Sequence, residues 1–240
     1  MQEVNPDNPY RKGQVLLFDK PETWTSFQVV KLVKTRLKYD CGLKKIKVGH
    51  AGTLDPLATG LLIVCTGKKT KEIQDFMGQE KVYEGSLVLG ATRPSVDRET
   101  EIDQEFPVDH IGSEMIEKVR QSFLGETDQF PPSFSAVKKD GKRAYELARE
   151  GKEVDLKSRK VVIKEFGICP MGNNEYAFRV VCSKGTYIRS LVRDFGEKLN
   201  SGAWMNTLRR TGIGSYSVQD AIHPKSFAPS NDQGASSSVE

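Results

Sequence analysis

The stretch GHAGTLDPLATGLLIVCTGKKTK, residues 49–71, decides the fold, because it joins a glycine-rich loop to a short, fully apolar run. The glycines of residues 49–60 permit backbone conformations closed to other residues, and Pro56 biases Asp55 towards an extended backbone. This part therefore predicts a loop. Residues 60–67, GLLIVCTG, predict a strand that is buried on both faces.

Asp55 is the only acidic residue from Ile46 to Lys71. Lysines crowd both ends of the stretch: Lys44, Lys45, Lys47, Lys68, Lys69 and Lys71. A lone carboxylate in a small-residue loop, inside a basic rim, indicates a reactive group beneath a polyanion site. Taken alone, an aspartate in an Asp-Pro loop is more often a turn residue. A carboxylate nucleophile must be ionised and desolvated, and an arginine partner would keep it ionised.

Short strands and helices alternate irregularly along the rest of the chain. Strands are predicted at 13–21, 81–90, 160–168, 175–183 and 213–218. Helices are predicted from the capping box of Thr25 and Gln28 to about Leu37, at 70–77, from an N-cap at Ser113 to a stop at Gly125, at 144–150, and from a cap at Thr186. Several strands adjoin each other in sequence. The pattern thus favours an α+β fold with a mixed, largely antiparallel central sheet flanked by helices.

Composition bounds the domain organisation and the class of protein. The 240 residues, 37% hydrophobic and 28% charged, suit one large soluble domain with small appendages. We expect a flexible N-terminal arm at 1–12, a main domain at 13–222 with an exposed basic excursion at about 129–160, and a polar, disordered tail at 223–240. The net charge of +4 permits a nucleic-acid partner without establishing one.

Several classes of function are disfavoured by what the sequence lacks. The cysteines form no C-x-x-C pair, which indicates reduced thiols in the cytoplasm and neither a zinc site nor a disulfide framework. The three histidines are scattered, so neither a metal cage nor a Ser–His hydrolase is supported. The stretch at 60–70 fails the P-loop pattern, which excludes an ATPase of that type. No apolar run is long enough for a membrane span, and the N-terminus has no signal-peptide core.

The stretch around Asp55 resembles the active-site signature of the TruB-type tRNA pseudouridine synthases. Five further blocks resemble that family in the same order along about residues 13–222. They are DKP with TS (19–26), KVYEGSLVLG (81–90), FPPSFSAVKKDGKRAYELAREG (130–151), SKGTYIRSLVRDFG (183–196) and LRRTGIG (208–214). The resemblance implies the pseudouridine synthase fold, with the excursion at 129–160 as an RNA-binding thumb. It also implies an enzyme that needs no cofactor and no metal.

The resemblance assigns roles residue by residue. Asp55 aligns with the catalytic aspartate, Tyr83 with the tyrosine that stacks on the target uracil, and Arg189 with the arginine that pairs with the catalytic carboxylate. The implied substrate-binding residues are His50, Asp97, Tyr187, Leu208, Lys20, Arg143 and Arg149. Without the joint pattern, Tyr83, Tyr187 and Leu208 read as core or cross-strand residues and Arg189 as a solvated helix residue. The residues leave open whether Asp55 attacks uracil C6 or ribose C1′, and which group removes the C5 proton.

The resemblance implies tRNA as the partner, held at its T stem-loop, with uridine 55 flipped out of the RNA. We expect a monomer that uses no guide RNA, because guide-dependent relatives carry accessory-protein surfaces and a C-terminal PUA domain, which we infer is absent here. The alternatives are a tRNA-folding chaperone with secondary catalysis and a synthase that acts on another RNA.

The sequence also departs from the family pattern in two places. Thr23 stands where the family commonly has glycine. In the loop that usually reads T-x-T-x-D-x-x-G, Asp97 is retained, whereas Arg93, Ser95 and Thr100 replace the two threonines and the glycine.

Overall fold

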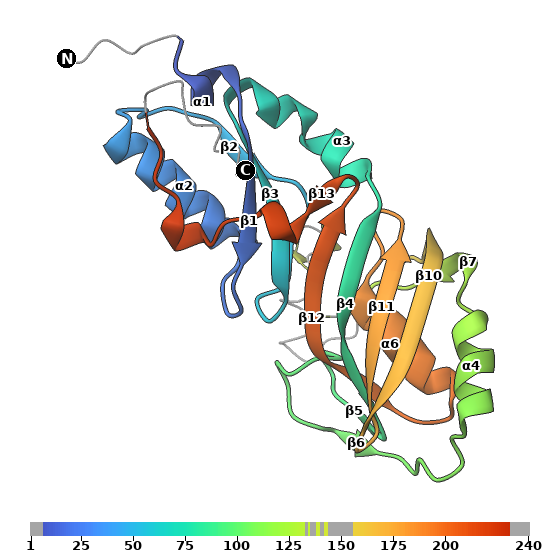
Figure 1. Ribbon diagram of the computed structural model, residues 1–240. Helices are drawn as coiled ribbons and strands as arrows, with labels where there is room; N and C mark the ends of the chain where they lie inside the picture. Colours follow the sequence, from blue (N-terminus) through green and yellow to red (C-terminus); the bar gives the residue numbers. More distant parts are fainter. Residues whose placement is uncertain (1–6, 133, 135–137, 140–141, 144–155, 231–240) are drawn as a thin grey trace, which may run out of the picture. The chain divides into compact units, whose positions relative to one another are not determined.

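The computed structural model describes residues 7–132, 134, 138–139, 142–143 and 156–230 (Figure 1). The chain forms two compact units, residues 1–79 with 210–240, and residues 80–209. The architecture is α+β, as predicted, and the strand pairings with a defined register are antiparallel. A parallel bridge joins Phe18 to Ile222.

The first unit builds a small sheet around strand β3, with β1 and β12 beside it and β2 also paired to it. Its helices are α1 (Pro9–Lys12), α2 (Ser26–Asp40) and α3 (Ile73–Gly78), with 3-10 turns η1 (Gly67–Glu72), η2 (Val218–Asp220) and η3 (Pro224–Ser226). Its strands are β1 (Val15–Lys20), β2 (Val48–His50), β3 (Thr59–Thr66), the end of β12 (Ala203–Ile213) and β13 (Tyr216–Ser217).

Strand β3 is buried on both faces, which confirms the prediction for residues 60–67. Leu62 and Val64 join a core with the inner face of α2. Leu61 and Ile63 point into a second core that includes Phe76 of α3. The fully apolar run is therefore explained by a strand with a packed layer on each side.

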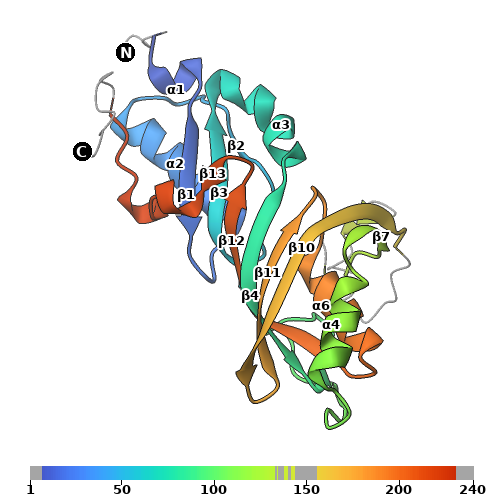
Figure 2. The same cartoon turned by 45° about the vertical axis from the view of Figure 1, so that its right-hand side comes forward.

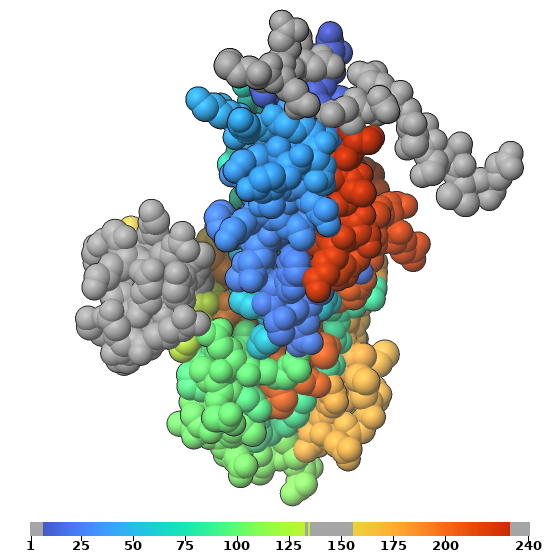
Figure 3. All heavy atoms as spheres, turned by 90° about the vertical axis from the view of Figure 1, so that its left-hand side faces the viewer, coloured from blue at the N-terminus to red at the C-terminus, as the bar shows by residue number. Residues whose placement is uncertain are grey.

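Helix α2 begins with the predicted capping box, in which the Thr25 side chain accepts from the Gln28 backbone and the Gln28 side chain accepts from that of Thr25. The helix buries four apolar side chains on one face: Val29, Val30, Val33 and Leu37. The helix continues to Asp40, three residues beyond the predicted end. Its outer face lies at the surface of the protein (Figure 3).

Residues 7–12 and 223–230 are more ordered than their composition predicts. In the N-terminal segment, the Asn8 side chain caps α1. Near the C-terminus, Phe227 is buried and packs edge-on against Phe18, with ring centroids 5.6 Å apart. The expectations of a flexible arm at 1–12 and a disordered tail at 223–240 are therefore wrong for residues 7–12 and 223–230. A single aromatic anchor in a polar segment leaves little trace in composition.

The second unit is a sheet in the order β12-β4-β11-β10-β7 (Figure 2). Its strands are β4 (Lys81–Leu89), β5 (Ala91–Thr92), β6 (Gln104–Glu105), β7 (Gly125–Gln129), β8 (Lys138–Lys139), β9 (Lys142–Arg143), β10 (Arg159–Gly172), β11 (Glu175–Cys182) and the start of β12. Helices α4 (Ser113–Gln121) and α6 (Ile188–Lys198) lie on one face of this sheet (Figures 1 and 2). Phe166 of β10 joins this layer, 5.5 Å from the ring of Phe195 and 6.3 Å from that of Phe123.

Two predicted helix caps are wrong by one residue. Gly112, not Ser113, is the N-cap of α4, and Tyr187, not Thr186, is that of α6. The Thr186 hydroxyl instead donates to the Ser183 carbonyl oxygen. The apolar face of α6 and its C-cap is buried: Ile188, Leu191, Val192, Phe195 and Leu199.

Strand β12 is the main element that the sequence did not predict, since a strand was expected only at 213–218. Charged residues interrupt the apolar pattern expected of a buried strand, because Arg210 occupies an inward position and is 1% exposed. Within residues 129–160, β8 and β9 pair as antiparallel strands. The predicted helix at 144–150 and Arg149 lie outside the described residues.

Candidate active site

The loop that carries Asp55 connects β2 to β3 in the first unit. Its backbone is fixed on the N-terminal side by Ser26, whose hydroxyl accepts from the Leu54 N–H at 2.9 Å. On the C-terminal side, the Ala58 N–H donates to the Asp55 carbonyl oxygen at 3.1 Å. Gly60 has a φ of +101°, and a Cβ there would lie 2.3 Å from the Arg210 carbonyl oxygen. The predicted loop therefore has one defined course, set by its glycine and by its contacts with α2.

Arg210 holds this loop through hydrogen bonds to its backbone. The sequence predicted no role for Arg210. Its guanidinium donates through Nε to the Leu61 carbonyl oxygen at 2.8 Å and through Nη2 to that of Gly52 at 3.1 Å. A buried guanidinium needs such partners, and here they are the backbone at both ends of the loop. The only signal in the sequence was its place in the LRRTGIG block.

Lys20 is fully buried beneath the same loop. Its ammonium donates to three carbonyl oxygens, those of Pro21 at 2.9 Å, Trp24 at 2.6 Å and Pro56 at 3.2 Å. An ammonium has three N–H donors, so none is left for an RNA phosphate. Burial lowers the pKa of Lys20 to about 8, opposed by Asp55 and reinforced by Arg210. The structure thus makes Lys20 a support of the loop, contrary to the predicted substrate contact.

His50 ends β2 and is partly buried. Burial lowers the pKa of its imidazole, Arg210 lowers it further, and a hydrogen bond with the Gly52 backbone opposes the shift. The imidazole is therefore neutral at pH 7. The first unit thus brings together His50, Asp55 and the buried cations that support their loop.

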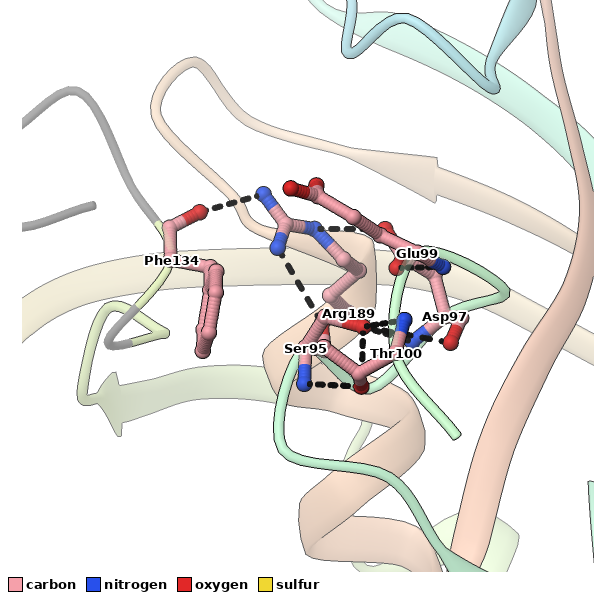
Figure 4. A network of polar contacts seen from close by, with 6 residues as sticks. All are labelled: Ser95, Asp97, Glu99, Thr100, Phe134 and Arg189. Atoms are coloured by element: carbon pink, nitrogen blue, oxygen red, sulfur yellow. Dashed lines mark hydrogen bonds and ion pairs between the residues drawn. The ribbon is translucent and has the colours of Figure 1, made fainter. Parts of the chain in front are cut away.

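Arg189 is the centre of the second unit's polar network (Figure 4). It is 4% exposed, and its Nε lies 3.7 Å from the Asp97 carboxylate, which is equally buried. Its Nη1 donates to the Ser95 carbonyl oxygen at 3.1 Å and its Nη2 to that of Phe134 at 2.8 Å. Arg189 is therefore buried, and not the solvated helix residue that the sequence suggests when the family resemblance is set aside. Asp97, predicted to contact the flipped base, lies beside this guanidinium.

Asp97 lies in the loop of residues 93–100. Hydrogen bonds made by Arg93, Ser95 and Thr100, which depart from the family pattern, hold this loop together. The hydroxyl groups of Ser95 and Thr100 lie 2.9 Å apart, and the Ser95 N–H donates to the Thr100 hydroxyl at 3.1 Å. Arg93 donates to the Thr100 carbonyl oxygen and stacks on Trp204, 4.2 Å from the ring centroid. The Asp97 carboxylate accepts from the Glu99 N–H at 3.0 Å. The substituted residues thus make a hydrogen-bonded loop of their own.

The remaining predicted residues of the second unit lie on its sheet and at the start of α6. Tyr83 of β4 is paired with Val180 of β11 and is 9% exposed, and Leu208 of β12 is 8% exposed. The Tyr187 backbone exchanges two hydrogen bonds with the Gln129 side chain, at 2.7 and 3.0 Å. The Arg159 guanidinium lies over the Tyr187 ring, 4.1 Å from its centroid. This unit thus holds Tyr83, Asp97, Tyr187, Arg189 and Leu208, while the pairing of Arg189 with Asp55 stays a prediction.

Among the residues that the structure describes, no group of three or more His, Cys, Asp and Glu side chains is arranged to hold a metal ion. None of the described helices has both the length and the apolar character needed to cross a membrane.

The α+β fold, with its central sheet flanked by helices, is that of the pseudouridine synthases, and a family model supports the same class. The family model described as "TruB family pseudouridylate synthase (N terminal domain)" matches residues 38–188. The chain belongs to the TruB family of pseudouridylate synthases. It is therefore an enzyme, an isomerase that makes pseudouridine.

Individual relatives agree with this membership. The chain is 58% identical to tRNA pseudouridine synthase B of Flavobacterium johnsoniae over 89% of its own length and 93% of the relative. It is 51% identical to tRNA pseudouridine synthase B of Phocaeicola vulgatus over 93% of its length and 95% of the relative. Among solved structures, it is similar to a chain in a Cbf5-Nop10-Gar1 complex, with 28% identity and a TM-score of 0.66. That match covers 92% of this chain and 57% of the other.

Proposed function

We propose that this enzyme isomerises uridine 55 in the T loop of tRNA to pseudouridine. The observation that carries the proposal is the Asp55 loop, whose backbone is tied to α2 by Ser26 and to β12 by Arg210. Relatives named tRNA pseudouridine synthase B, at 58% and 51% identity over nearly the full chain, support tRNA as the substrate.

The proposed chemistry breaks the bond between ribose C1′ and uracil N1 and forms a bond between C1′ and C5. The hydrogen on C5 leaves and N1 gains one, so atoms and electrons balance without a cofactor. Asp55 acts as the nucleophile, and its loop holds the carboxylate in one place before the substrate arrives. Tyr83 offsets part of the few kcal/mol lost on flipping by stacking on the uracil.

Arg189 supplies the counter-charge for Asp55 in this proposal. Its guanidinium is preorganised, because Asp97 and two carbonyl oxygens hold it within the second unit. A carboxylate taken from water loses stabilisation of its ionised form, and a fixed cation restores it. His50, Tyr187 and Leu208 line the base pocket, and Asp97 acts through Arg189.

The proposal also covers how the RNA is bound and where in the cell the enzyme acts. The thumb at 129–160, with Arg143 and Arg149, holds the T stem-loop of the tRNA. The catalytic domain comprises residues 13–222. The enzyme acts as a monomer. All four cysteines are free thiols, and burial raises the pKa of Cys65 and Cys182 to about 11. Free, protonated thiols suit the reducing cytoplasm.

The test is to incubate the purified protein with unmodified tRNA transcript, without cofactor or guide RNA, and to map pseudouridine. We expect one product, at position 55, and none in a matched transcript with cytidine at that position. Absence of product at the T-loop uridine would contradict the proposal. Product only when a guide RNA is added would establish the guide-dependent alternative instead.

A further inference from the structure

A groove runs along the outer side of α2, in the first unit, and the chemistry described above makes no use of it. Its volume is about 420 Å³, and it is lined by Trp24, Gln28, Lys31, Leu32, Thr35 and Arg36. Trp24 and Leu32 are half-buried and pack against the core beneath α2. Two apolar side chains, Trp24 and Leu32, therefore share the lining of the groove with two cationic ones, Lys31 and Arg36.

A stripe of positive charge lies beside this groove. Lys31, Lys34 and Lys38 follow each other at helical spacing and are all exposed. Two exposed aromatic rings flank the stripe, Phe27 at 67% and Tyr39 at 71% exposure. In the view of Figure 3, this face of α2, in blue, is turned towards the viewer. Cations interleaved with aromatic rings are typical of surfaces that bind single-stranded nucleic acid.

The charge of the whole protein is concentrated in this region. Residues 22–47 contain seven cationic and two acidic residues, a net charge of +5, against +4 for the whole chain. All the other residues together therefore carry a net charge of −1. One of the two acids, Asp40, is already paired with Arg36 at 3.6 Å. Four of the seven cations lie on α2 and the other three at 44–47, so this part of the first unit attracts a polyanion.

The groove starts beside the Asp55 loop. Trp24 and Ser26 stand at the beginning of α2, and the Ser26 hydroxyl bonds the backbone of Leu54. The Thr23 N–H donates to the Pro56 carbonyl oxygen at 2.8 Å. A polynucleotide with one nucleotide at Asp55 therefore meets this surface within the same compact unit.

We propose that the outer face of α2 binds the sugar–phosphate backbone of the RNA substrate next to the flipped nucleotide. Phosphates lie on Lys31, Lys34 and Lys38, and an unpaired base or a ribose packs against Trp24 in the groove. A protein partner fits less well, because the cores of protein interfaces are depleted in charge whereas this groove is rimmed by cations. The inference rests on the proposed function only in taking RNA as the substrate.

The test measures tRNA binding over a series of salt concentrations. The variant K31S/K34S/K38S is compared with K118S/K160S/K164S, which removes the same charge from exposed positions of the second unit. For the α2 variant, we expect the slope of log Kd against log salt to fall by about 2, and Kd at 0.15 M salt to rise on the order of tenfold. The control variant keeps both values close to those of the parent.

Both variants are made on an Asp55→Asn background, so that binding is measured without isomerisation. The binding result therefore remains valid even if the enzyme does not modify uridine 55. An α2 variant with unchanged slope and Kd overturns the inference. So does a variant that alters self-association in sedimentation without altering tRNA binding, because α2 would then be a protein interface.

The groove itself is tested by fluorescence. The chain has two tryptophans, so Trp204→Phe leaves Trp24 as the single reporter. We expect saturating tRNA to quench the emission of Trp24, and K31S/K34S/K38S to shift the midpoint of that quenching to higher tRNA concentration. Emission that is unaffected by saturating tRNA contradicts contact with the groove.

Discussion

The Nε of Arg189 lies 3.7 Å from the carboxylate of Asp97, and both side chains are buried within one unit. The carboxylate is held in turn by the backbone of its own loop. Asp97 therefore fixes the direction of the guanidinium before any RNA binds. The loop of residues 93–100 therefore positions Asp97, and Asp97 positions Arg189, the proposed counter-charge of Asp55.

Replacing Asp97 by Asn should weaken both stability and catalysis. The amide keeps the shape of the side chain but leaves the buried guanidinium without its charge partner, at a cost of about 1–3 kcal/mol. Urea unfolding measures the stability loss, and single-turnover pseudouridine formation measures the rate. Asp103→Asn is the control, since Asp103 is exposed and bonds only the neighbouring strand. Equal behaviour of the two variants would argue against a role for Asp97 in holding Arg189.

Removing the hydroxyl of Thr100 should loosen the same loop. Thr100→Val keeps the volume but removes the partner of the Ser95 hydroxyl and N–H, which costs about 1–2 kcal/mol. Thr100→Ser retains the hydroxyl and should retain the stability. Thermal unfolding of the two variants measures the difference. If valine and serine are tolerated alike, the bonds to Ser95 contribute nothing.

Thr23 should be a site where glycine stabilises the protein relative to alanine. Its φ is +68°, a region that costs a residue with a Cβ about 1–2 kcal/mol. Thr23→Gly relieves that cost, although glycine adds entropy to the unfolded chain. We therefore expect Thr23→Gly to be more stable than Thr23→Ala by about 1 kcal/mol in urea unfolding. Equal stability of the two variants would mean that the strain is not stored there.

Stability below neutral pH should depend on His50. Its pKa in the folded protein is lowered from the ordinary 6.5, chiefly by burial. The unfolded chain therefore takes up a proton first as the pH falls through 6.5, and the free energy of unfolding falls with it. His50→Gln should lose less stability than the parent between pH 7 and pH 5. His223→Gln serves as the control for an exposed histidine, and identical pH profiles for parent and His50→Gln would refute the effect.

The sequence predicted those parts of the fold in which local pattern and tertiary packing agree. The capping box of Thr25 and Gln28 starts α2, and the apolar run at 60–67 forms β3 with packing on both faces. The Asp55 loop was recognised because its glycines and its single acid are confined to a short stretch.

The parts that were missed depend on charged or aromatic side chains in unexpected places. Arg210 occupies a buried position of β12, so the strand lacks an apolar alternation and the residue that supports the Asp55 loop was passed over. Lys20 reads as a surface lysine, yet its ammonium is satisfied by backbone carbonyl oxygens that only the folded chain brings together. Phe227 anchors a segment whose composition is otherwise polar. Such partners are distant in sequence, and no local pattern records them.

The most direct test of Asp55 as the nucleophile uses tRNA labelled with tritium at uracil C5, because forming the new bond at C5 releases that hydrogen. For Asp55→Asn, we predict that single-turnover tritium release falls by at least about a thousandfold, the scale seen when a nucleophile is removed. Its tRNA affinity should stay close to that of the parent. Tritium release by Asp55→Asn at a rate within tenfold of the parent would contradict the account.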